Sequence, residues 1–151
     1  MGCFWLPSTH EPFLSVRDRS TITHNEVSSY RYTGISCGWS WTYTETRSGF
    51  NEISHNNIST IGMGELCDLA CVYHLGQDNG TIISRNLCTN VSSHGYGGAA
   101  YYTDAGSSNV TISSVRTSDC PLASIYLTHH SRCDVCACKG AGAGGWLHLT
   151  T

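Results

Sequence analysis

The sequence has few charged residues, few prolines and no long apolar run. Charged residues make up 13% of the 151 residues, the formal net charge is −3, and Lys139 is the one lysine. Proteins that bind nucleic acid or anionic membranes carry clusters of Lys and Arg, which this composition does not offer. No run approaches the roughly 20 apolar residues of a membrane span. We therefore expect no nucleic-acid partner and no membrane partner.

The N-terminus lacks the features of a signal peptide. Residues Met1–Pro7 have no basic segment, and their apolar stretch is too short for secretion. The nine cysteines do not settle the compartment either, because an odd number cannot all pair within one chain. Localisation is therefore unknown from the sequence itself.

Hydroxyl side chains, glycine and asparagine are abundant. The chain has 20 Ser, 16 Thr, 16 Gly and 8 Asn. These residues favour short strands and turns over helices. The length suits a single domain. We expect an all-β fold.

An internal repeat of about thirty residues runs through the chain. Its anchors Ile22, Ile53, Ile83 and Ile112 are 31, 30 and 29 residues apart. After each of the first three, Asn follows at the third position and an apolar residue two positions later. Apolar and polar residues alternate within each segment, which is the period of a strand. Successive repeats therefore predict stacked strands.

A second series lies between these anchors. Val72 and Tyr101 are 29 residues apart, whereas Ile35 and Val72 are 37 apart, which predicts a longer loop in the first coil. Coils that stack about 4.8 Å apart bury their apolar residues in one core, and Asn at a fixed place can form a ladder. An antiparallel sandwich would space its strands by 8–12 residues. The pattern favours a right-handed parallel β-helix, a pectin-lyase-like solenoid of about three coils that is truncated.

The repeat predicts three segments. Residues 1–12 are unassigned, and residues 13–115 form the β-helix coils. Residues 116–151 lack the repeated pattern of Ile, Asn and an apolar residue. They form a Cys/Gly-rich tail, which is either disordered or an artefact of the gene model. Open coil ends expose strand edges, so we expect self-association through them.

Three blocks resemble a known family. They are Thr33–Trp41, Leu66–Gly76 and Tyr96–Asn109. In this order they resemble the core of right-handed β-helix carbohydrate-active proteins, glycoside hydrolase family 141 and its relatives. That family acts on plant cell-wall glycans such as fucosylated pectin or xylan. The resemblance covers residues 13–115 and implies a secreted protein.

The resemblance implies a catalytic pair of carboxylates, Asp68 and Asp104. The sequence departs from the family pattern at Leu69 and Ala70, which replace two glycines, and at Ala105, which replaces Glu. Paired carboxylates suit the chemistry, since glycoside hydrolysis needs two carboxyl groups that flank the scissile bond, one of them protonated.

The repeat register imposes a condition on this pair. It sets Asp104 opposite Leu75, seven residues beyond Asp68. A straight strand rises about 3.3 Å per residue and would hold the two carboxylates far apart. Only a sharp corner between Asp68 and Val72 brings them together. The alternative is an ion pair between Asp68 and Arg31 of the preceding coil.

Three further residues are candidate substrate-binding residues. His74 lies beside Asp104 in the register, where it would orient Asp104, bind a sugar hydroxyl or be an ordinary surface histidine. Trp39 and Tyr102 would line the groove, and the Trp39 ring would stack on a sugar ring. Trp41 alternates with Trp39, so one of these two rings could lie in the core instead.

The sequence offers no convincing metal or cofactor site. The coils contain no lysine and no tight acidic cluster, which disfavours a Ca²⁺-dependent polysaccharide lyase. In the tail, zinc would need a second ligand pair beside the run His129, His130, Cys133, Cys136 and Cys138. We expect no metal and no cofactor.

Together these features predict a fragment of a glycoside hydrolase. It would act on plant or algal cell-wall polysaccharide or oligosaccharide by paired-carboxylate catalysis in its full-length form, with little or no activity in this chain alone. The alternative is a non-catalytic β-helix remnant or a glycan-binding module, and a polysaccharide lyase ranks behind both.

Overall fold

The computed structural model describes residues 14–16, 18–38, 40, 43–120, 123–127, 132–136, 139–141 and 147–149. Side chains are described for residues 18–38, 40, 43–120 and 125–127. This part of the chain contains strands and no helix, as the composition predicts. It accordingly contains no apolar helix of membrane-spanning length.

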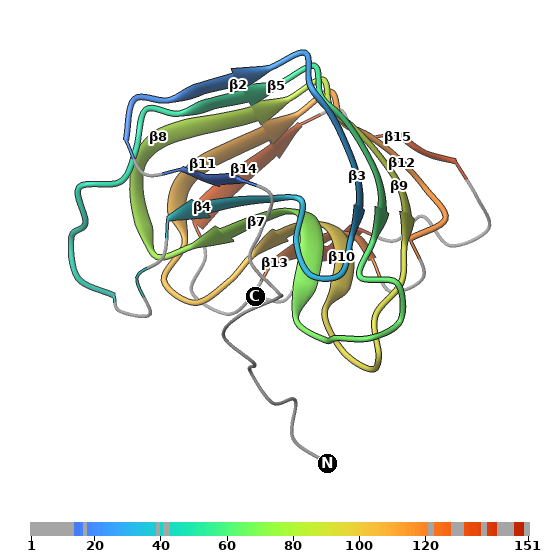
Figure 1. Ribbon diagram of the computed structural model, residues 1–151. Helices are drawn as coiled ribbons and strands as arrows, with labels where there is room; N and C mark the ends of the chain where they lie inside the picture. The colour runs from blue at the N-terminus through green and yellow to red at the C-terminus, as the bar shows by residue number, and fades with distance from the viewer. Residues whose placement is uncertain are drawn as a thin grey trace.

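The strands form three parallel sheets that wrap around one core (Figure 1). The first sheet comprises β1 (Leu14–Val16), β4 (Ile35–Gly38), β7 (Leu69–Leu75), β10 (Gly98–Thr103), β13 (Ala123–Leu127) and β16 (Leu147–Leu149). The second comprises β2 (Thr21–Thr23), β5 (Glu52–Ser54), β8 (Gln77–Ser84), β11 (Ser108–Ser113) and β14 (Arg132–Cys136). The third comprises β3 (Glu26–Tyr30), β6 (Asn57–Ile61), β9 (Leu87–Val91), β12 (Arg116–Ser118) and β15 (Lys139–Ala141).

The predicted repeat register is the observed one. In the second sheet, Ile53 pairs with Ile22 on one side and Ile83 on the other, and Ile83 pairs in turn with Ile112. In the first sheet, Val72 pairs with both Ile35 and Tyr101. The parallel β-solenoid is therefore confirmed, with coils stacked in the order of the sequence.

The asparagine ladder is also present. Oδ1 of Asn56 accepts hydrogen bonds from the backbone and side-chain amides of Asn25, both at 3.0 Å. Oδ1 of Asn86 accepts the same two bonds from Asn56, at 2.9 and 3.0 Å. Each residue before these asparagines, such as His55, has a left-handed backbone with φ near 55°. The ladder therefore fixes the tight corner between the second and third sheets.

The interior is apolar and contains a disulfide. Its buried side chains include the Ile, Val and Leu residues predicted to point inward. Cys71 of the first sheet is bonded to Cys88 of the third, which links two walls of the solenoid. Cys67 is disulfide-bonded as well. Disulfides of this kind persist in oxidising compartments.

Parallel pairing continues past Val115, where the sequence repeat stops. β12 pairs with β9 and β15, and β13 pairs with β10 and β16. Strand pairing uses backbone groups, so it needs no Ile–x2–Asn signature. The described segments of the Cys/Gly-rich tail thus lie in the three sheets rather than apart from them.

β7 and β10 bend where the predicted pair of carboxylates requires a corner. Along β7, Leu69 and Cys71 point into the core, but so does Val72, which directly follows Cys71. Ala70, Tyr73 and Leu75 belong to a second apolar cluster outside the coil. Two consecutive inward residues break the alternation of a flat strand. The pairing of β7 with β10 also skips Cys71, and both strands bend in Figure 1.

Candidate functional site

Asp68 lies just before β7, in a backbone conformation unusual for a non-glycine residue. Its φ is 61°, in the left-handed region. The next coil holds it there, because the amides of Asp68 and Leu69 donate to the carbonyls of Tyr96 and Gly97 at 2.9 and 2.7 Å. A Cβ atom on Gly97 would lie 2.6 Å from the Asp68 Cα, so the approach requires glycine. The same backbone conformation occurs at other corners of the coils, such as His55.

Asp104 lies just after β10, whereas Asp68 lies just before β7 of the preceding coil. Its amide donates to the carbonyl of His74 at 2.8 Å, and its own carbonyl accepts the amide of Ser107 at 3.0 Å. The residues that follow form a turn. The pairing with β7 and this turn together fix the backbone position of Asp104.

Two tyrosines connect the aspartates crosswise between coils. Tyr73 and Tyr102 pair in register on β7 and β10, and their rings meet edge to face with centroids 4.8 Å apart. The Tyr73 hydroxyl donates to Oδ2 of Asp104, in the next coil. The Tyr102 hydroxyl hydrogen-bonds to Asp68, in the preceding coil. The bend therefore brings the two aspartates into one cluster on the outside of the solenoid.

The surroundings of Asp68 favour its protonated form. Burial raises the pKa of Asp68 and the negative charge of Asp104 raises it further, although the hydrogen bond from Tyr102 lowers it in part. Oδ1 of Asp68 is buried and has no hydrogen-bond partner among the described residues. Asp68 is thus a carboxyl group that favours protonation, and its buried oxygen makes no hydrogen bond with the described residues.

The tyrosine hydroxyls stay protonated and act as donors. Burial raises the pKa of Tyr73 and of Tyr102, and the charges of both aspartates raise it further. Tyr32 behaves in the same way, with burial first and the charge of Asp68 second. The site is therefore lined by neutral aromatic donors around two acidic groups.

Arg31, the predicted ion-pair partner of Asp68, pairs with Glu65 instead. Arg31 lies 3.1 Å from Glu65, and both side chains are partly exposed. The charge that acts on the pKa of Asp68 is that of Asp104. A satisfied pair between Asp68 and Arg31 is therefore not the arrangement found.

The other candidate residues have different positions. Trp39 and Trp41 lie outside the described residues. Tyr102 is buried, and its hydroxyl contacts Asp68. His74 points into the solenoid and is fully buried, so its ring does not face the two aspartates. Its link to Asp104 is through its backbone carbonyl.

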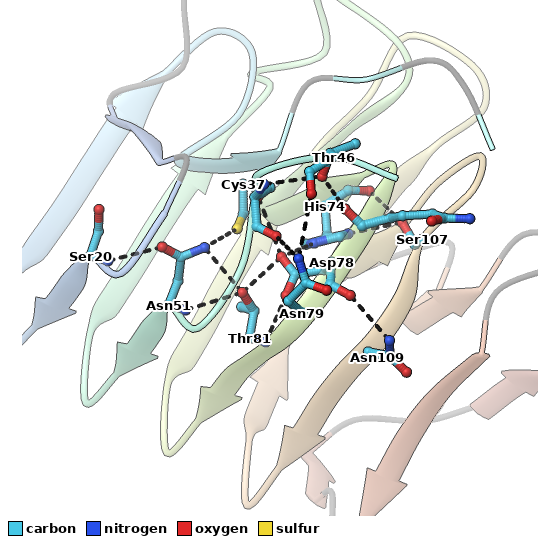
Figure 2. Close-up of polar contacts among 12 residues, drawn as sticks. Ser20, Cys37, Thr46, Asn51, His74, Asp78, Asn79, Thr81, Ser107 and Asn109 are labelled. Carbon is cyan, nitrogen blue, oxygen red and sulfur yellow. Dashed lines mark hydrogen bonds and ion pairs between the residues drawn. The ribbon is translucent and has the colours of Figure 1, made fainter. Parts of the chain in front are cut away.

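The interior behind Asp104 holds a polar cluster of Cys37, His74 and Asp78, which the sequence did not predict (Figure 2). The His74 Nε2 atom lies 3.1 Å from Oδ2 of Asp78. Thr81 donates to Asp78 twice, from its amide at 2.7 Å and from its hydroxyl at 2.9 Å. The Asn51 side-chain amide donates to Sγ of Cys37 at 3.5 Å.

These contacts shift the ionisation of the cluster. Burial by itself would raise the pKa of Asp78, but the hydrogen bond and charge of His74, together with Thr81, outweigh it and lower the pKa. Burial raises the pKa of the Cys37 thiol to about 12, and the charge of Asp78 adds to this. The predicted register held a signal for the cluster, since it set Cys37 opposite His74 with both residues two positions past an inward side chain.

Comparison with known proteins supports a carbohydrate-active role. No protein-family model matches the chain, and no curated protein does. A solved structure described as "Glycoside hydrolase" is similar, with 27% identity and a TM-score of 0.65. The match covers 80% of this chain but 20% of the other, so this chain spans about one fifth of its length. Relation to family 141 in particular stays a prediction.

Proposed function

We propose that the chain carries the catalytic carboxylates of a glycoside hydrolase that acts on plant or algal cell-wall polysaccharide. Asp68 is the general acid, and Asp104 is the base or the nucleophile. One observation carries the proposal: two aspartates from neighbouring coils meet outside the bend, each held by a tyrosine of the other coil.

The two environments suit the two roles. The raised pKa of Asp68 keeps its proton toward neutral pH, as a group that protonates a leaving oxygen must do. Asp104 accepts the Tyr73 hydroxyl, which orients its carboxyl group. Tyr102 holds Asp68 in orientation but does not take part in the proton transfer itself.

Hydrolysis by matched variants tests this proposal. Release of reducing sugar from cell-wall glycans is measured for the wild-type chain, Asp68→Asn, Asp104→Asn and the control Asp119→Asn, whose side chain is exposed. Three coils offer a short binding surface, so we expect slow turnover. Each of the two site variants should lose about 10²–10⁴-fold of that rate, while Asp119→Asn keeps it. Equal rates in all four proteins would contradict the assignment.

A second candidate function is a glycan-binding module without activity. Ala105 stands where the family resemblance implies a glutamate, so a supporting carboxylate beside Asp104 is missing. If the chain is a binding module, the folded wild type binds glycan and releases no sugar, and Asp68→Asn binds with the same affinity. Sugar release by the wild type would exclude it.

A further inference from the structure

A second site lies inside the solenoid, on the far side of the first sheet from the aspartate pair. Cys37 lies near the end of β4, His74 lies in β7, and Asp78 lies near the start of β8. Their ligand atoms, one from each residue, all lie within 4.8 Å of one another (Figure 2). The exposed fractions are 0%, 0% and 2%. These are three donor types that zinc uses in proteins, gathered in a place that bulk water does not reach.

The contacts of Ser107 orient the His74 ring. The Ser107 hydroxyl lies 3.1 Å from the carbonyl of His74 and 2.9 Å from Nδ1 of the same residue. When the imidazole hydrogen lies on Nδ1, the Ser107 oxygen accepts it. Nε2 then has a bare lone pair for a metal ion.

Nε2 of His74 faces a carboxylate. Nε2 and Oδ2 of Asp78 are 3.1 Å apart. Thr81 donates to both oxygens of Asp78 and so fixes the orientation of its carboxyl group. Without a metal ion, a hydrogen on Nε2 donates to Oδ2. With the hydrogen on Nδ1, Nε2 and Oδ2 are two ligand atoms close enough to bind one ion.

The sulfur of Cys37 completes the donor set. The Asn51 side chain and the Gly38 amide both hydrogen-bond to it, and a metal ion would bind it as the thiolate. A thiolate and a carboxylate together neutralise one divalent cation, which leaves the buried assembly without net charge. Ligands about 2.0–2.1 Å from one tetrahedral zinc lie roughly 3.3 Å apart, close to the observed nitrogen-to-oxygen distance.

We propose that Cys37, His74 and Asp78 bind a structural divalent zinc ion inside the coil, with the Ser48 hydroxyl or a water as fourth ligand. Ser48 already lies 3.4 Å from Oδ2 of Asp78. The outer contacts resemble those of metal sites in general, in which the second nitrogen of a ligating histidine donates to a nearby oxygen. Here that oxygen belongs to Ser107, three residues after Asp104, so the metal also braces the turn that carries Asp104.

Metal content and cobalt spectroscopy test this site without any activity measurement. The 151-residue chain is purified, loaded with Zn²⁺, freed of unbound ion and measured for zinc. We expect one ion per chain and a lower melting temperature after chelation, because binding to the folded form stabilises it. With Co²⁺ in place of zinc, we expect a thiolate-to-cobalt charge-transfer band and the strong visible bands of a tetrahedral site.

Matched variants locate the ion. Cys37→Ser and Asp78→Asn should lose the bound metal, and Cys37→Ser should lose the charge-transfer band, while Cys120→Ser keeps both. Cys136→Ser tests whether ions bind at the Cys/Gly-rich tail instead, and we expect it to keep the zinc. No bound zinc in the folded wild type, or loss of zinc in Cys136→Ser with retention in Cys37→Ser, would overturn the proposal. The wild-type result decides even if a core variant fails to fold.

Discussion

Tyr73 and Tyr102 pair side by side on neighbouring coils, yet each hydrogen-bonds to the aspartate that belongs to the other's coil. The crossed arrangement ties the geometry of the two carboxylates to the register of β7 and β10. A slip of one residue in either strand would send the tyrosine of that strand to the inner face. The candidate site therefore depends on the same stacking that forms the core.

Removing the Tyr102 hydroxyl should change the pH dependence of hydrolysis. This hydroxyl lowers the pKa of Asp68, so Tyr102→Phe should raise that pKa further. A general acid works while protonated, and the alkaline limb of the kcat/KM profile should therefore move to higher pH. The measurement is the pH profile of wild type and variant on one glycan substrate. A shift to lower pH, or none, would argue against Asp68 as the acid.

Tyr73→Phe should act on the other carboxylate. It removes the donor to Oδ2 of Asp104, which leaves the base or nucleophile free to rotate. We expect kcat to fall about 10-fold or more with little change in KM, as for a loss of orientation in the transition state. Steady-state kinetics of Tyr73→Phe give this result directly, with the exposed-site variant Tyr43→Phe as control. A change in KM alone would indicate a substrate-binding role instead.

Gly97 should be essential to the backbone of Asp68. Gly97→Ala adds a Cβ atom 2.6 Å from the Asp68 Cα, at a φ of 77° that L-residues rarely adopt. Gly95→Ala is a matched control, because its φ of 125° is also unfavourable but nothing lies within 4 Å of the added atom. We expect Gly97→Ala to lose activity well beyond any loss in Gly95→Ala. Equal effects of the two variants would mean that the close approach to Asp68 does not matter.

The asparagine ladder should carry a measurable share of the stability. Asn56→Ala removes side-chain bonds to Asn25, Asn86 and the carbonyl of Ile22 inside a buried corner. We expect the free energy of unfolding to fall by about 2–4 kcal/mol, since buried partners are left unsatisfied. Urea denaturation of Asn56→Ala against the exposed neighbour variant Asn57→Ala measures it. Similar midpoints for the two variants would contradict the ladder's importance.

The disulfide across the interior should also stabilise the coils. We expect the double variant Cys71→Ala/Cys88→Ala to lose about 3 kcal/mol, the value for a closed loop of this size. Both cysteines are replaced because the sulfur of Cys120 lies 3.9 Å from the sulfur of Cys88. The two would pair if Cys71 alone were removed. Urea denaturation compares the variant with Cys120→Ser. No loss of stability would mean that the bond forms without constraining the coil.

The sequence predicted most of the fold because stacked coils place similar residues at a regular spacing along the chain. Ile22, Ile53, Ile83 and Ile112 occur at the spacing that their pairing requires, and the asparagines mark the corner. Beyond Val115 this spacing ends although strands continue, since backbone pairing does not need particular side chains. The sequence repeat therefore accompanies the strands up to Val115 and is absent from the described strands beyond it.

The candidate site was predicted only in part. The family resemblance implied Asp68 and Asp104, and the register required a corner, which the structure has between Cys71 and Val72. The crossed tyrosines could not be foreseen, because they depend on how far that corner turns. His74 was expected on the outside, but after the bend the alternation of β7 restarts and the ring points inward.

The most direct test of the central claim is to titrate the Asp68 carboxyl by NMR in wild type and in Asp104→Asn. The account predicts a pKa above the ordinary aspartate value in wild type, because burial and the charge of Asp104 both act on it. In Asp104→Asn, which removes that charge, the pKa should fall. An ordinary pKa for Asp68 in the folded wild type, or one that does not respond to Asp104→Asn, would contradict the paired-carboxylate account.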